Sequence, residues 1–322
     1  MRRTFSFRPV LAACLSGLLF CSAVQATADV SKVPPPGIYR FKLGQLDVTA
    51  LSDGTHPFPV DTVMVGTTDT EIGKALDHEF LGRPPAGSIN AFLIHTGQQL
   101  VLVDAGAGAL YGDCCGQVLQ QIRAAGYSPE QVDVVLLTHL HKDHVGGITA
   151  SGRALFPNAV IRASKADLDY WSSTTAKARA PDFLASFFDA AVEALAPYKA
   201  AGRLRPIEGA GPIGDDIAAI TSPGHTPGHL SYSFTSGGQT LVVMGDLIHV
   251  AALQLPHPEV TVKYDSDGTA ARQSRVTELR AAARGRWLLA AAHVSFPGLG
   301  HVRETSGGFE WVPVNFEAAP TR

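Results

Sequence analysis

The fold of this chain is decided by the stretch VDVVLLTHLHKDH at residues 132–144. Its first part, residues 132–137, is short and apolar, which predicts a buried strand. Its second part places three histidines and one aspartate within six consecutive residues, His139 to His144. Neutral imidazole is a frequent ligand of zinc and related ions, and a carboxylate oxygen can complete such a site. The stretch therefore predicts a transition-metal site on a loop held at the end of a strand.

Three later segments repeat the pattern of a strand followed by a metal-ligating residue type. His225 lies in the segment PGHTPGH, whose glycines and prolines fix a tight loop. Asp246 follows the apolar residues 241–244, and His293 follows the apolar residues 287–291. Sites in layered α/β folds gather at the carboxyl ends of strands. A single histidine after a strand is more often structural than a ligand, so the prediction rests on all of these positions together.

The remaining pattern predicts an α/β fold. The expected strands cover residues 39–41, 46–51, 91–94, 100–103, 132–137, 158–162, 217–221, 230–234, 241–244 and 287–291, and the expected helices cover residues 117–125, 166–171, 180–200 and 270–284. Because groups of strands alternate with helices, we expect two sheets sandwiched between helical layers.

Composition limits the possible functions. The chain has 322 residues, of which 45% are hydrophobic, enough apolar material for one large domain or two small ones. The formal net charge is -3 and there is no long basic run, so we expect no nucleic-acid partner.

The N-terminus is typical of a targeting segment. Basic residues occur within residues 2–8, an apolar stretch spans residues 10–24, and an A-x-A-like cleavage site ends at Ala26. The apolar stretch is too short to favour a stable membrane span. We therefore expect a periplasmic or secreted protein, and the Arg2-Arg3 pair also fits a twin-arginine signal. The expected organisation is a signal peptide at residues 1–26, a proline-rich linker at residues 27–37 and one large domain at residues 38–322.

Two of the four cysteines, Cys114 and Cys115, lie outside this signal and are adjacent. Neighbouring cysteines rarely form a bridge without strain. A zinc site built on two cysteines needs a spacer between them. The pair is therefore interpreted as two small core or loop residues.

The run H-x-H-x-D-H followed by His225, Asp246 and His293 resembles the metallo-β-lactamase superfamily. The resemblance implies a four-layer αβ/βα sandwich, with two mixed β-sheets flanked by helices and a two-metal site along one edge. It also implies that the first ion is held by His139, His141 and His225. The second ion would be held by Asp143, His144 and His293, and Asp246 would bridge both ions.

Within this superfamily, the chain is most similar to the methyl parathion hydrolase branch, through residues 51–55, 126–133, 295–303 and 308–315. Lys142 departs from that branch, where proline is common, and would place a cation beside the metals unless it points to solvent. The resemblance suggests an apolar pocket wall made of four aromatic residues, Tyr111, Trp171, Phe187 and Phe188, for which ordinary core packing is the alternative. Asp104 and His229 are expected to support the metal-binding loops without ligating.

Two divalent ions ~3.5–4 Å apart can share a water and lower its pKa toward neutrality. The family implies such ions here, with Zn²⁺ first and Mn²⁺, Fe²⁺ or Co²⁺ as alternatives. The bridging hydroxide would act as the nucleophile. Asp246 would bridge the ions and accept a hydrogen bond from the hydroxide, and Asp143 is the second residue expected to be catalytic. The predicted substrate is a small neutral ester, either an organophosphate triester or a lactone.

Other functions remain open within the same fold. An acyl-homoserine lactone lactonase and a glyoxalase II-like thioesterase use similar ligands. A β-lactamase is disfavoured because those enzymes lack an aspartate in the role of Asp246. An iron-dependent persulfide dioxygenase is disfavoured because it holds one iron on fewer ligands. A homodimer is also left open.

Overall fold

The structure is a computed structural model that describes Met1 and residues 36–316. The predicted signal peptide, apart from Met1, and the linker up to Pro35 lie outside the described residues. From Gly37 onward the chain is hydrogen-bonded to the domain. The Gly37 amide donates to the side chain of Gln121 at 2.9 Å, and the Ser52 amide donates to the Gly37 carbonyl at 2.8 Å. Among the described helices, none combines the length and apolarity that a membrane crossing needs.

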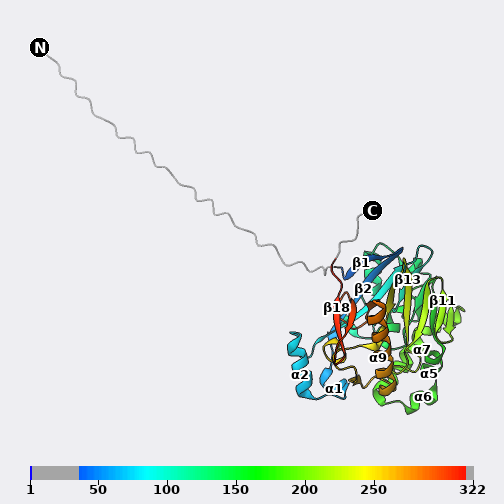
Figure 1. The fold of residues 1–322 in the computed structure, drawn as a ribbon. Helices are drawn as coiled ribbons and strands as arrows, with labels where there is room; N and C mark the ends of the chain where they lie inside the picture. The colour runs from blue at the N-terminus through cyan, green and yellow to red at the C-terminus, as the bar shows by residue number, and fades with distance from the viewer. Residues whose placement is uncertain (2–35, 317–322) are drawn as a thin grey trace. The chain divides into compact units, whose positions relative to one another are not determined.

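Two seven-stranded sheets form the centre of the domain (Figure 1). The N-terminal sheet has the order β1 (Ile38–Leu43), β2 (Leu46–Pro57), β4 (Ala86–His95), β5 (Leu100–Val103), β6 (Val134–Leu136), β9 (Val160–Ser164) and β10 (Leu204–Ile207). The C-terminal sheet has the order β11 (Gly211–Gly214), β12 (Ile217–Thr221), β13 (Leu230–Ser236), β14 (Gln239–Val243), β16 (Leu288–Ala290), β17 (Leu299–Glu304) and β18 (Phe309–Pro313). Both sheets are mixed. In the N-terminal sheet, β5, β6, β9 and β10 run parallel to one another, and in the C-terminal sheet β14 runs parallel to β16. The other neighbouring strands are antiparallel.

Two small sheets lie outside these layers: β3 (Met64–Val65) with β15 (Thr261–Val262), and β7 (Thr149–Ala150) with β8 (Arg153–Ala154). The α-helices are α1 (Val60–Val63), α2 (Asp69–His78), α3 (Val118–Ala124), α4 (Lys142–Val145), α5 (Lys165–Trp171), α6 (Thr174–Arg179), α7 (Ala185–Ala200), α8 (Ala251–Gln254) and α9 (Gly268–Gly285). Single 3₁₀ turns are η1 (Gly112–Cys114), η2 (Pro129–Gln131), η3 (Gly146–Ile148), η4 (Asp182–Leu184) and η5 (Gly245–Leu247).

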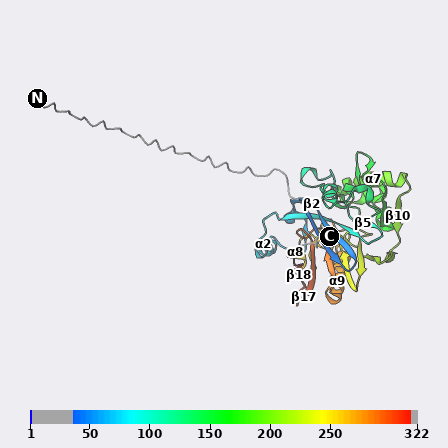
Figure 2. The ribbon, with the colours of Figure 1, turned by 90° about the horizontal axis from the view of Figure 1, so that it is seen from above.

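The period-two alternation of side chains along each strand builds the layers. On β4, Leu93 packs toward α3, α5 and α7, whereas Phe92 packs between the two sheets. On β14, Val243 packs between the sheets, whereas Val242 packs against α9. Figure 2 shows α7 and α9 on opposite sides of the strands. The predicted sandwich of two mixed sheets flanked by helices is therefore confirmed.

Several elements differ from the sequence-based expectation. The helix expected over residues 180–200 is divided, because Pro181 has extended backbone and α7 begins only at Ala185. The strand β11 was not expected, since its sequence GPIG carries no alternating pattern. The helix α2 was also missed, although Thr68 and Glu71 form a capping box at its start. None of these differences involves the strands β6, β12, β14 and β16, whose ends carry the predicted ligands.

Candidate metal centre

The predicted ligands come from four loops that follow strands. His139 follows β6, and His225 follows β12. Asp246 lies in η5 directly after β14, and His293 follows β16. Hydrogen bonds between these loops fix their mutual positions, since the Leu230 amide, just after the His225 loop, donates to the Thr138 carbonyl at 2.9 Å. The carboxyl ends of strands from both sheets therefore meet at one edge of the sandwich.

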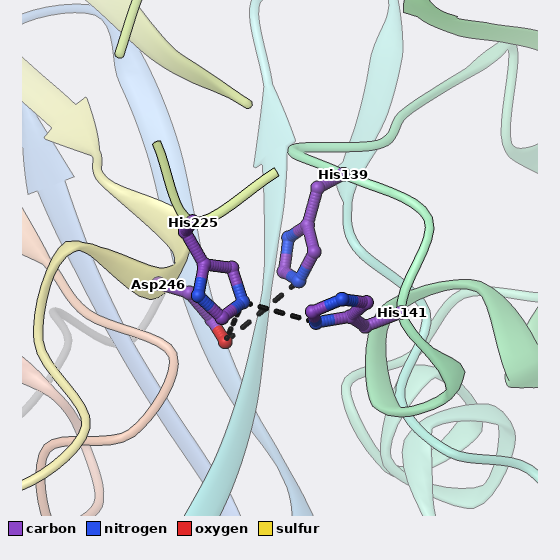
Figure 3. Close-up of side chains that lie close together, drawn as sticks. All are labelled: His139, His141, His225 and Asp246. Atoms are coloured by element: carbon purple, nitrogen blue, oxygen red, sulfur yellow. Dashed lines mark hydrogen bonds and ion pairs between the residues drawn. The ribbon is translucent and has the colours of Figure 1, made fainter. Parts of the chain in front are cut away.

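The first group of donor atoms consists of His139, His141, His225 and Asp246, which converge in Figure 3. One ligand atom from each residue lies within 4.8 Å of the others, and all four residues are buried. The Nε2 atom of His225 lies 3.3 Å from Oδ2 of Asp246 and 3.0 Å from Nδ1 of His141. Nε2 of His139 lies 3.7 Å from the same Asp246 oxygen. This is the set that the resemblance assigned to the first ion and its bridge.

The second group consists of Asp143, His144 and His293. Oδ2 of Asp143 lies 3.7 Å from Nε2 of His144 and 3.5 Å from Nε2 of His293. Asp246 approaches this group as well, because its Oδ1 lies 3.0 Å from Nε2 of His144 and its Oδ2 lies 3.1 Å from Nε2 of His293. Asp246 thus contacts both groups, as a bridging carboxylate must.

The donor set fits divalent cations. Three buried atoms of the cluster make no hydrogen bond: Nε2 of His139, Nε2 of His144 and Oδ1 of Asp246. Such orphaned atoms are costly unless an ion or another partner satisfies them. Burial lowers the pKa of His139 and His141 well below the usual value, which keeps both rings neutral as metal ligands must be. Although burial opposes a charge on Asp246, the surrounding histidines hold its pKa well below the usual range.

Asp104 orients ligands of both groups. Its Oδ2 accepts a hydrogen bond from Nδ1 of His144 at 2.8 Å and another from the Thr138 hydroxyl at 2.8 Å. That hydroxyl lies 3.0 Å from Nδ1 of His139, which can donate to it. In both histidines the Nδ1 proton is therefore engaged and Nε2 is left free for a metal, an arrangement common among ligating histidines. The left-handed backbone of Asp104, with φ of 58°, directs the carboxylate under the loop.

The other two histidines have their own orienting acceptors. Nδ1 of His225 donates to the carboxylate of Asp265 at 2.8 Å, and Nδ1 of His293 donates to the Ser88 carbonyl at 2.7 Å. Although burial opposes it, the carboxylates of Asp246 and Asp265 raise the pKa of His225 to about 9. The same negative field would attract a metal cation.

A cavity opens over this cluster, and its wall differs in part from the predicted one. The residues that line it are His56, Phe58, Tyr111, His141, Asp143, Phe187, His225, Asp246, His249, Tyr264 and His293. Tyr111 and Phe187 thus lie on the wall. Trp171 and Phe188 lie behind it in the core, each 2% exposed and packed ring to ring at 4.6 Å. Trp171 supports His141 from behind, with ring centroids 5.0 Å apart, so for these two aromatics the core-packing alternative describes their position.

His249 is a polar residue of the site that the sequence reasoning missed. Its Nε2 lies 3.1 Å from Oδ2 of Asp246, and its ring stacks on that of His293 with centroids 5.3 Å apart. Asp246, His249 and His293 form a third set of atoms that can hold an ion. The signal available was its position three residues after Asp246. Nothing in the sequence pointed to Tyr264 and Asp265 in the same way, because the strand that precedes them, β15, is only two residues long.

Lys142, next to two of the ligands in sequence, contacts the start of α7. Its ammonium donates to the Ser186 hydroxyl at 2.7 Å and lies 4.9 Å from the centre of the Phe187 ring. The cation therefore holds the start of α7 over the cavity wall. Cys114 and Cys115, interpreted above as small core or loop residues, form no disulfide with each other. Cys114 is exposed and Cys115 is buried.

The fold and the buried cluster together define a metal-dependent hydrolase of the αβ/βα sandwich class. The metallo-beta-lactamase superfamily model matches residues 84–293, so the chain belongs to this superfamily.

Among solved structures, the chain is similar to AbOPH, a hydrolase in the beta-lactamase superfamily. The two are 33% identical, with 89% of this chain and 100% of that chain covered and a TM-score of 0.85. It is also similar to AidC, a dizinc quorum-quenching lactonase solved with a product. That pair is 27% identical, with 88% and 99% covered and a TM-score of 0.82. A further relative, the uncharacterized protein YobT of Bacillus subtilis, is 26% identical over 163 residues. That match covers 51% of this chain and 63% of YobT.

Proposed function

We propose that this protein is a two-metal hydrolase of small neutral esters, with a lactone as its first candidate substrate and an organophosphate triester as the second. The observation that carries the proposal is the pair of buried donor groups joined by Asp246. His139, His141 and His225 would hold one ion, and Asp143, His144 and His293 would hold the other. When bound, the ions supply an activated water and polarise the oxygen of the scissile bond.

The chain's own residues prepare the reaction in three ways. Asp104 and Asp265 keep the ligating imidazoles oriented, which removes the cost of reorganisation when charge develops. Tyr111 offers a donor at the cavity wall, because burial and the nearby Asp143 carboxylate raise the pKa of its phenol and keep it protonated. Phe187 and Phe58 limit the entry of bulk water.

The preference for a neutral substrate is supported by the cavity's charges. Among the described residues that line it, none is a lysine or an arginine. A cephalosporin and a glutathione thioester both carry carboxylates that such a cation would bind. The aromatic rings of Tyr111, Phe187 and Tyr264 instead suit an apolar acyl or aryl group. The similarity to AidC supports the choice of a lactone first and of Zn²⁺ as the resident metal.

Two finer assignments belong to the same proposal. Membership of the methyl parathion hydrolase branch rests on the sequence segments quoted above. Export to the periplasm or the medium rests on the N-terminal sequence pattern. An export assay with residues 1–26 deleted would test the second assignment, since retention of export without them would overturn it.

The function is tested by a turnover panel on zinc-loaded protein with a δ-lactone, an aryl phosphotriester, a cephalosporin and a glutathione thioester. We expect hydrolysis of one or both neutral substrates and little of the two charged ones. His139→Ala and Asp246→Asn should abolish turnover and lower metal content, whereas His257→Ala, at an exposed histidine, should change neither. Preferred turnover of the cephalosporin or thioester, or no turnover with two ions bound, would overturn the proposal.

A further inference from the structure

The loop that carries His225 is held by a buried carboxylate from another part of the chain. Asp167 lies in α5, and its side chain is fully buried. Its Oδ2 accepts a hydrogen bond from the Thr226 hydroxyl at 2.9 Å, and its Oδ1 accepts one from the Gly228 amide at 2.7 Å. These two partners lie one and three residues after His225. Asp167 therefore fixes the loop at two points directly beside a predicted metal ligand.

The contact between this loop and α5 joins the two sheets. The helix follows β9 of the N-terminal sheet, whereas the loop follows β12 of the C-terminal sheet. The approach is close, because a Cβ atom at Gly228 would lie 2.4 Å from the Asp167 backbone nitrogen and 2.5 Å from the Ser164 hydroxyl oxygen. The two sheets are separate hydrogen-bonded units. Contacts of this kind therefore decide how closely the ligands of one sheet approach those of the other.

The same helix supports a second ligand of the first donor group. Trp171 lies four residues after Asp167 in α5, a spacing that places both side chains on one face of the helix. The Trp171 ring packs edge to face against His141, with ring centroids 5.0 Å apart. Nδ1 of His141 in turn lies 3.0 Å from Nε2 of His225 (Figure 3). One helix face thus supports two ligands that come from different sheets and contact each other.

Burying a carboxyl group is costly unless it is hydrogen-bonded. Burial raises the pKa of Asp167 to about 6, although the hydrogen bonds from Thr226 and Gly228 oppose this rise. A loop that is ordered before an ion arrives removes the entropic cost of ordering it from the binding step. We propose that Asp167 is a positioning residue that fixes His225 beside His141 and so strengthens binding of the first ion. The inference rests on the proposed metal site.

The test is ¹¹³Cd NMR of the full chain, labelled with ¹⁵N-histidine and loaded with Cd²⁺ as the probe. The first ion should couple to three histidine nitrogens and the second to two, so the couplings assign each signal. In Asp167→Ala, a competing chelator should release the first ion at about tenfold lower concentration than in the wild type, while the second ion is retained. Asp167→Asn should restore wild-type binding. Its oxygen still accepts from the Gly228 amide, and the Thr226 hydroxyl can accept as well as donate.

Asp53→Ala is the matched control, because Asp53 is also a fully buried carboxylate that accepts from backbone amides, but from amides outside the His225 loop. It should lower thermal stability and leave both ions bound. Thr226→Val keeps the side-chain shape and removes one hydrogen bond, so it decides the matter if Asp167→Ala fails to fold. Wild-type affinity for the first ion in either folded variant, or equal weakening of both ions, would overturn the inference. A wild type without two signals would instead overturn the proposed metal site, and the inference with it.

Discussion

Replacing Asp104 with asparagine should weaken metal binding at both donor groups, although Asp104 contacts neither ion position. The carboxylate accepts three hydrogen bonds of 2.8 Å, from the Thr138 amide, the Thr138 hydroxyl and Nδ1 of His144. Asparagine has nearly the same shape but replaces one oxygen with a donor. At least one of the three donors then faces another donor.

The two orientations of the asparagine both carry a cost. If its amino group faces Nδ1 of His144, two donors meet unless the ring proton moves to Nε2. Nε2 is the atom that lies 3.0 Å from Oδ1 of Asp246. If its amino group faces the Thr138 amide, the loop that carries His139 is pushed away. Loss of such an orienting partner weakens metal binding by about 10–100-fold, which corresponds to about 1.4–2.8 kcal/mol. The buried mismatch should also lower the free energy of unfolding by about 1–3 kcal/mol.

The assay is a competition titration of Zn²⁺ against a chromophoric chelator, with thermal unfolding measured on the same samples. Asp53→Asn is the matched control, because Asp53 is also a buried carboxylate and accepts from the amides of Ala107, Gly116 and Val118 at 2.8 to 3.1 Å. It should lose stability but retain Zn²⁺ affinity. Wild-type affinity for both ions in Asp104→Asn would refute the assigned role of Asp104.

Three further changes test other parts of the site. Phe187→Ala should alter KM differently for short-chain and long-chain lactones while metal content stays constant. An equal change for all substrates would contradict the assignment of Phe187 to the pocket wall. Trp171→Ala should lower the free energy of unfolding by about 3–5 kcal/mol and loosen His141, so an unfolding titration that finds it harmless would contradict its place in the core. Burial raises the pKa of Glu278 from 4.5 to about 8, so the native state binds the extra proton and stability should fall as pH rises between these values. In Glu278→Gln, the free energy of unfolding measured with urea at several pH values should depend less on pH in this range. An unchanged slope would mean that another group causes the pH dependence.

The sequence predicted the sheet core and the donor set because both depend on local patterns. The apolar stretch that ends at Leu137 lies directly before the first histidines in the chain, and Asp246 and His293 likewise follow apolar stretches. The edge of the sandwich brings these short patterns together, and any chain with this order of strands would do so.

Other parts of the site could not be predicted, because they depend on packing between distant elements. Trp171 and Phe187 are both aromatic and lie in neighbouring helices, yet one is in the core and the other on the cavity wall. Their sequence neighbourhoods do not distinguish these positions, since the direction of each helix decides them. Asp265 reaches His225 from a separate segment, so no spacing along the chain predicts this contact.

The two donor groups joined by Asp246 should hold two ions. The most direct measurement is the number of Zn²⁺ ions that remain bound per chain after dialysis, determined by elemental analysis. We expect close to two ions in the wild type and a clear loss in Asp246→Asn, with the exposed-histidine control His257→Ala retaining two. A wild-type protein that binds no tightly held ion, or an Asp246→Asn protein that still holds two, would contradict it.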